Sequence, residues 1–94
     1  MDLEFEWDLR KAAGNLEKHK VSFEEAGTVF GDPLGRIVPD TRHSLEENRY
    51  VLLGLSKDKR LLTVMYVERG CAVRIVSARQ ATGWEQKNYE TTIE

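Results

Sequence analysis

Arginines are the residues of this chain whose type points most directly to chemistry. The block of residues 36–79 holds nine basic and five acidic residues, whereas residues 1–35 hold four basic and eight acidic ones. A guanidinium donates paired hydrogen bonds to phosphate through a planar fork. Charge alone leaves two interpretations open, a phosphate-binding site or charged side chains on the solvent side of strands. Seven of the eight arginines lie in the block: Arg36, Arg42, Arg49, Arg60, Arg69, Arg74 and Arg79.

The residue types near these arginines would suit cleavage of RNA without a metal. That reaction needs a base for the 2′-hydroxyl proton, cationic donors for the phosphate and an acid for the leaving oxygen. Arg79 is the first candidate for the phosphate, because we predict that a strand ends there and a helix follows. Glu68 beside Arg69 is a candidate base, although a strand-end ion pair explains it equally well. His43 lies in a polar loop and titrates near neutral pH, but a loop histidine is more often incidental.

Several classes of protein are disfavoured by composition. The sequence shows no metal-ligand cluster and no glycine-rich phosphate loop, so we expect side-chain catalysis with no metal and no cofactor. Cys71 is the single cysteine, which fits a reducing cytosol. An acidic N-terminus without an apolar stretch is not a secretory signal, and no run of 18 apolar residues predicts a membrane span. We predict one cytoplasmic domain over residues 1–94.

The first third of the chain predicts a strand and two helices. Alternating residues 3–7 indicate a short strand. Asp8 is a helix cap, and the apolar side of the helix that it opens is predicted to include Leu9 and Leu16. Ser22 opens a second helix, with Glu25 completing a capping-box pattern.

The rest of the chain predicts strands and a final helix. Residues 36–39 read as an edge strand and 40–48 as a polar loop, followed by strands over 49–56, 61–68 and 71–77 joined by tight turns. Thr82 and Glu85 form a second capping box that opens a C-terminal helix. The predicted fold is α+β: a twisted antiparallel sheet with two N-terminal helices and a C-terminal helix packed on one face. Trp7 and Trp84 are expected in the core.

A pattern of residues extends over almost the whole chain, and its most specific segments are Lys18–Ala26 (KHKVSFEEA) and Arg74–Arg79 (RIVSAR). With this pattern the chain resembles the BrnT family of type II toxins. One departure is Lys20, where the family usually has glycine, the residue that a helix end favours. The further marks are Phe5–Asp8, Lys11, Asn15, Val29, Phe30, Asp32, Pro33, Asp40, His43, Ser44, Glu47, Arg49, Arg60–Leu62, Glu68, Arg69, Ala81, Glu85 and Tyr89.

The resemblance implies a RelE-like fold and a metal-independent ribonuclease that blocks translation. It also implies neutralisation by a BrnA-like antitoxin with a ribbon-helix-helix DNA-binding domain, so that DNA would be contacted only through the antitoxin. The implied catalytic candidates are Arg49, Arg69, Arg79, Glu68 and His43, and we assign Lys18, His19, Arg60 and Arg74 to RNA binding.

Two other functions stay open at this point. The chain could be a non-catalytic toxin-like subunit that acts in antitoxin binding and promoter autoregulation, or a sheet domain with an unrelated ligand. Retention of the candidate charges favours the nuclease. In a simple meander, however, Arg49, Arg69 and Arg79 do not lie at one end of the sheet, so the proposed site depends on their measured separation.

Overall fold

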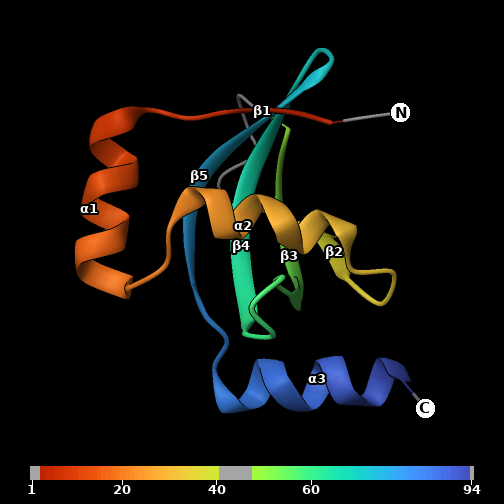
Figure 1. Cartoon of the computed structure of the whole chain (residues 1–94). Helices are drawn as coiled ribbons and strands as arrows, with labels where there is room; N and C mark the ends of the chain where they lie inside the picture. The colour runs from red at the N-terminus through yellow and green to blue at the C-terminus, as the bar shows by residue number, and fades with distance from the viewer. Residues whose placement is uncertain (1–2, 41–47, 94) are drawn as a thin grey trace.

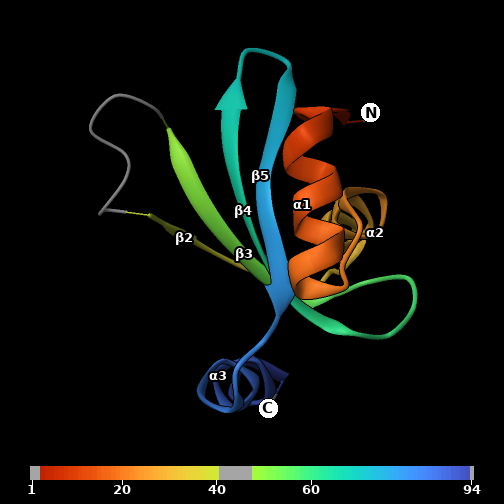
Figure 2. The ribbon, with the colours of Figure 1, turned by 90° about the vertical axis from the view of Figure 1, so that its left-hand side faces the viewer.

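The computed structural model describes residues 3–40 and 48–93. In Figures 1 and 2, α1 and α2 cover one face of a twisted sheet, and α3 lies across one end of it. The predicted α+β fold is confirmed, except that α3 does not share the face that α1 and α2 cover. The elements are β1 (Glu4–Glu6), α1 (Leu9–His19), α2 (Phe23–Thr28), the 3-10 turn η1 (Val29–Gly31), β2 (Arg36–Pro39), β3 (Arg49–Leu55), β4 (Leu61–Arg69), β5 (Ala72–Gln80) and α3 (Gly83–Ile93).

The sheet has the strand order β1-β5-β4-β3-β2. The strands β2 to β5 form the antiparallel meander that the turn residues predict. The first strand, however, runs parallel to β5, so the sheet is mixed and the prediction of a purely antiparallel sheet is wrong. Alternation of apolar residues predicts a strand but does not encode the direction of a partner about seventy positions away.

Side-chain caps set the helix ends as the sequence indicates. The Asp8 carboxylate accepts hydrogen bonds from the backbone N–H groups of Lys11 (3.0 Å) and Arg10 (2.8 Å), and these bonds lower the pKa of Asp8. At the other end of α1, Lys20 adopts the left-handed conformation with φ of 60°. The departure from glycine therefore lies at a position where a side chain is strained.

The core lies between the sheet and the helices α1 and α2. Leu62, Val64 and Ile75 from β4 and β5 pack with Phe23 of α2. The buried residue of α1 is not one of its leucines, because Leu9 is 79% exposed and Leu16 is 50% exposed. The predicted apolar side of α1 is wrong in this respect, since a polar residue, Asn15, takes the buried position.

The opposite face of the sheet carries the alternate residues of each strand. On β4 these are Thr63, Met65 and Val67, because Leu62 and Val64 belong to the core and successive side chains point to opposite faces. Figure 2 shows α1 and α2 on one side of the sheet and the other side open above α3. We call this second side the open face.

Candidate functional site

Strand register places most of the candidate arginines on the open face. Arg79 on β5 pairs with Thr63, while Arg74 on β5 and Arg49 on β3 both pair with Val67. Paired residues share a face of the sheet. Arg36 pairs with Leu53, which in turn pairs with Thr63, so Arg36 lies on the same face. Arg69 lies two residues beyond Val67 on β4 and also belongs to this face.

Arg79 is held by a carboxylate from α3. Its Nη1 donates to Glu85 Oε1 (2.8 Å) and its Nη2 donates to Glu85 Oε2 (3.0 Å), which is the two-pronged geometry of a strong ion pair. Thr63 Oγ1 (3.0 Å) and the N–H of Thr82 (2.9 Å) also donate to Oε1. The hydrogen bonds from Arg79 are the main reason that the pKa of Glu85 falls to about 2, and they raise the pKa of Arg79 in turn.

The backbone around Arg79 is fixed from the other side of β5. Asn15 Nδ2 donates to the Ala78 carbonyl (2.8 Å), and the Ala78 N–H donates to Asn15 Oδ1 (3.1 Å). This buried side chain thus pairs with the strand edge as a short neighbouring strand would. The predicted strand end at Ser77 is wrong, because the strand continues to Gln80 and Arg79 lies inside β5, but a helix does follow from Gly83 as expected. Pairing with Thr63 and Leu62 extends the strand beyond Ser77.

A second group of charges lies near the turn between β4 and β5. Arg74 Nη1 donates to Glu6 Oε2 (2.9 Å), and Arg69 Nη1 lies 3.8 Å from the same oxygen. The Arg69 side chain is 55% exposed, so this longer contact contributes little to stability. Arg69 could therefore turn toward a bound anion at small cost.

The two groups are separate. Thr63, the partner of Arg79, and Val67, the partner of Arg49 and Arg74, are four residues apart on β4. Four residues of strand span roughly 13 Å. The structure therefore does not gather Arg49, Arg69 and Arg79 into one cluster, but it does place them along one face that an extended strand of RNA could follow.

The candidate acids and bases are distributed differently. Glu68 pairs with Val73, a core residue, so it belongs to the face opposite that of Arg69. There it forms a hydrogen bond with Tyr50, which raises the pKa of that phenol. His43 lies outside the described residues.

The remaining RNA-binding candidates lie away from the open face. Arg60 Nε donates to Glu25 Oε2 (2.9 Å), and its Nη2 donates to Glu25 Oε1 and to the Lys20 carbonyl (3.0 Å). These bonds join the turn before β4 to the turn between α1 and α2. Lys18 and His19 occupy the last turn of α1, where basic side chains complement the helix dipole.

Neither a membrane span nor a metal-binding cluster is found in the described parts of the chain. Each described helix is too short or too polar to cross a membrane. Within residues 3–40 and 48–93, His, Cys, Asp and Glu side chains do not gather in threes around a possible metal position.

A sequence profile described as "Ribonuclease toxin, BrnT, of type II toxin-antitoxin system" matches residues 7–85. The chain belongs to the BrnT family of ribonuclease toxins. The crystal structure of the Brucella abortus ribonuclease toxin BrnT superposes with a TM-score of 0.67 and 19% sequence identity, over 86% of this chain and 99% of that one. At this identity the likeness confirms the BrnT fold and no more. No curated protein sequence matches the chain.

Two residues of this BrnT family member take part in the site although sequence analysis gave them no role there. Sequence analysis identifies Glu85 as the last residue of a capping box and as a mark of the family pattern, and Asn15 only as a mark of that pattern. The capping box does form, because the Glu85 N–H donates to Thr82 Oγ1 (3.2 Å). Asn15 could have been predicted as a buried polar residue because it stands among the apolar positions of α1. No local pattern indicated that Glu85 would bind Arg79.

Proposed function

We propose that this toxin binds RNA along the open face and cuts it without a metal, with Arg79 stabilising the phosphate. The observation that carries the proposal is the fixed position of Arg79, held by Glu85 on a face that also bears other arginines. In a cell such cleavage would inhibit translation. Lys18, His19 and Arg60 are left out of the proposed surface because they lie away from it.

The proposed chemistry is attack of a 2′-hydroxyl on the adjacent phosphate. Negative charge then builds on the phosphate oxygens, and prepositioned cationic donors stabilise it most effectively. A guanidinium carries five N–H donors. Among the described residues, Glu85 and the Gln80 carbonyl accept from three of those of Arg79, so two remain for a phosphate oxygen.

Glu85 is a positioning residue in this proposal. A carboxyl with a pKa of about 2 is ionised at neutral pH, so it cannot supply a proton and is a weak base. Glu68 is left out because it belongs to the other face. We propose His43 as the acid or base, because histidine is the side chain that most often serves in general acid–base catalysis and the chain enters β3 at Arg49 soon after it.

We further propose that an antitoxin with a ribbon-helix-helix domain covers the open face, and that DNA is contacted only through that partner. An exposed apolar side chain accompanies the arginines: Val38 on the edge strand β2 is 48% exposed and pairs with Val51 of the open face. An acidic amphipathic segment would match both the charge and the apolar area.

The proposal is tested by incubating the purified chain, free of antitoxin, with a defined RNA and an excess of EDTA. We expect cleavage at an unchanged rate and products that end in a cyclic 2′,3′-phosphate and a 5′-hydroxyl. The same RNA with 2′-O-methyl groups should remain intact. Cleavage that EDTA abolishes would contradict the metal-independent mechanism, and no cleavage in any condition would favour the non-catalytic antitoxin-binding function.

A further inference from the structure

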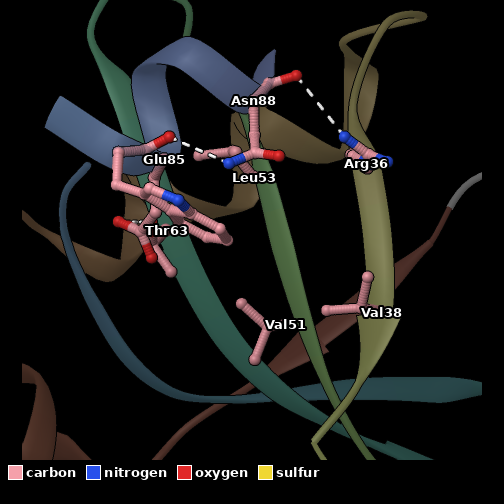
Figure 3. Close-up of a pocket in the computed structure, with 8 residues that line it drawn as sticks. Arg36, Val38, Val51, Leu53, Thr63, Glu85 and Asn88 are labelled. Atoms are coloured by element: carbon pink, nitrogen blue, oxygen red, sulfur yellow. Dashed lines mark hydrogen bonds between the residues drawn. The ribbon is translucent and has the colours of Figure 1, made fainter. Parts of the chain in front are cut away.

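A small apolar groove lies between the open face of the sheet and α3. Its volume is about 260 Å³, and Figure 3 shows Val38, Val51 and Leu53 along it, with Arg36 and Glu85 on different sides. Trp84 also lines it. The groove is smaller than the clefts of about 300–1,000 Å³ that hold drug-sized ligands. It would therefore accept one flat ring system more readily than a helix of a protein partner.

Trp84 is the unusual member of the lining. Its side chain is 75% exposed, so the expectation that it belongs to the core is wrong. It is the second residue of α3, and Tyr89 further along the helix provides the core contact instead. An exposed indole lacks the stabilisation that burial of its apolar area would give. Such exposure is expected of a side chain that is buried only when a ligand binds.

The backbone that carries Trp84 is well anchored. The capping box of Thr82 and Glu85 fixes the first turn of α3. Near the middle of the helix, Tyr89 Oη donates to Asp32 Oδ2 (2.7 Å). Burial, together with this hydrogen bond, raises the pKa of Tyr89 to about 12, so the contact is intact at neutral pH. Trp84 thus lies on a helix that is anchored at its first turn and again at Tyr89.

Arginine side chains lie at or next to both ends of the groove. Glu85 in the lining is the partner of Arg79, and Arg36 lies on the β2 side, where its Nη1 donates to the Asn88 carbonyl (3.4 Å). The site thus combines an apolar floor and an exposed aromatic face with Arg36 in its lining, and Arg79 adjoins it through Glu85. An RNA nucleotide has the matching chemistry, because its base has a flat π-face and its phosphates are anionic.

We propose that this groove binds one unstacked base of the RNA substrate, stacked on Trp84, with a neighbouring phosphate at Arg79. This inference rests on the proposed function and adds to it a subsite beside the point of cleavage. Base stacking tolerates any base, so the groove contributes affinity and register along the open face. An apolar segment of a protein partner would use the floor but would make no use of the two N–H donors that Arg79 keeps beside the groove.

The test uses a single-stranded RNA oligonucleotide with 2′-O-methyl groups, which binds but cannot be cut. The chain has two tryptophans, and Trp7 packs edge-on against Phe23 on the covered face. In Trp7→Phe, which keeps Trp84, we expect saturable quenching of fluorescence by the oligonucleotide. In the matched variant Trp84→Phe, which keeps Trp7, we expect little change. Equal quenching in both variants would overturn the proposal.

A second measurement does not depend on fluorescence of the protein. With a dye-labelled oligonucleotide of the same kind, Trp84→Ala should bind about 5- to 150-fold more weakly, the range for loss of one stacked base. Trp84→Phe should lose less. If Trp84→Ala binds as tightly as the wild type, the groove is no base subsite and its apolar lining is left to a protein partner.

The outcomes also separate this inference from the proposed nuclease function. Binding of the uncleavable oligonucleotide at Trp84 by a chain that cuts no RNA would support the subsite and refute the nuclease. A chain that cuts RNA while Trp84→Ala binds and cuts like the wild type would support the nuclease and refute the subsite.

Discussion

Two arginine–glutamate ion pairs in this toxin share the same local sequence pattern but make different contacts in the fold. In each pair the glutamate stands three residues after a serine or threonine that caps a helix, and its carboxylate accepts two hydrogen bonds from one guanidinium. The arginines are similarly exposed, at 32% and 31%. With their capping residues, the pairs are Ser22–Glu25–Arg60 and Thr82–Glu85–Arg79.

The pairs differ in what they join. Arg60 reaches Glu25 and the Lys20 carbonyl, 35 and 40 positions away, and Ser56 Oγ donates to the same carboxylate (2.7 Å). Among the described residues, Arg79 donates to Gln80 and Glu85, one and six positions away. The arginine of the first pair therefore connects distant parts of the chain, whereas the arginine of the second pair contacts residues near it in the sequence. The capping pattern predicts the position of a carboxylate. It does not predict whether the arginine bound to that carboxylate contacts distant or neighbouring parts of the chain.

The largest stability effect should come from breaking the first pair. Arg60→Ala leaves a carboxylate that is 8% exposed without its cation, so we expect a loss of about 3 kcal/mol in the free energy of unfolding. Urea denaturation followed by circular dichroism measures it. The control is Arg10→Ala on the exposed side of α1, which should change stability by less than about 0.5 kcal/mol. Equal, small effects of both variants would show that Arg60 does not stabilise the fold.

The second pair should show its contribution through pH. The pKa of Glu85 is about 2 in the folded chain against an ordinary 4.5. A depressed pKa stabilises the fold above the unfolded value, and this stabilisation disappears as pH falls toward the folded value. Glu85→Gln should therefore be less stable than wild type by roughly 2 kcal/mol at pH 6, after allowance for the partial exposure of Arg79.

This difference between wild type and Glu85→Gln should narrow between about pH 4.5 and pH 2. Urea denaturation of the two proteins at matched pH values measures it. A difference in stability that stays constant over that range would show that the ion pair between Glu85 and Arg79 does not stabilise the fold.

The smallest expected effect on stability concerns Lys20, whose carbonyl accepts a hydrogen bond from Arg60. Lys20 supplies a carbonyl to Arg60 from the left-handed conformation, with φ of 60°. Lys20→Gly should keep that hydrogen bond and relieve the strain, raising the free energy of unfolding by about 1 kcal/mol. The matched change Lys18→Gly, inside α1, should lower it by a similar amount. Destabilisation by Lys20→Gly would mean that the lysine side chain contributes more than its backbone costs.

Local features of this fold were predictable from sequence, and long-range ones were not. Helix starts at Asp8, Ser22 and Thr82 and the β2–β5 meander follow from caps, turns and periodicity, which act over a few residues. The parallel pairing of β1 with β5 joins Phe5 to Val73 and has no local signature. The same limit hid the distances between candidate arginines, because the register of strands fixes them.

The exposure of side chains near the site was also beyond local patterns. Trp84 would be buried by its residue type, yet α3 turns Tyr89 toward the core and Asp32 instead. The partner of Arg79 could be named only when α3 was placed beside β5. In contrast, the family pattern singled out Arg79 itself, although its role in catalysis stays a prediction.

The most direct test of the account is the single-turnover rate of RNA cleavage by Arg79→Ala in EDTA, compared with wild type and with Arg10→Ala. Loss of one prepositioned donor to a developing anion costs about 10²–10³ in rate. We predict a fall of that size for Arg79→Ala, with the fold retained by circular dichroism because the contacts of Arg79 are local, and an unchanged rate for Arg10→Ala. Cleavage by folded Arg79→Ala at the wild-type rate would contradict the account.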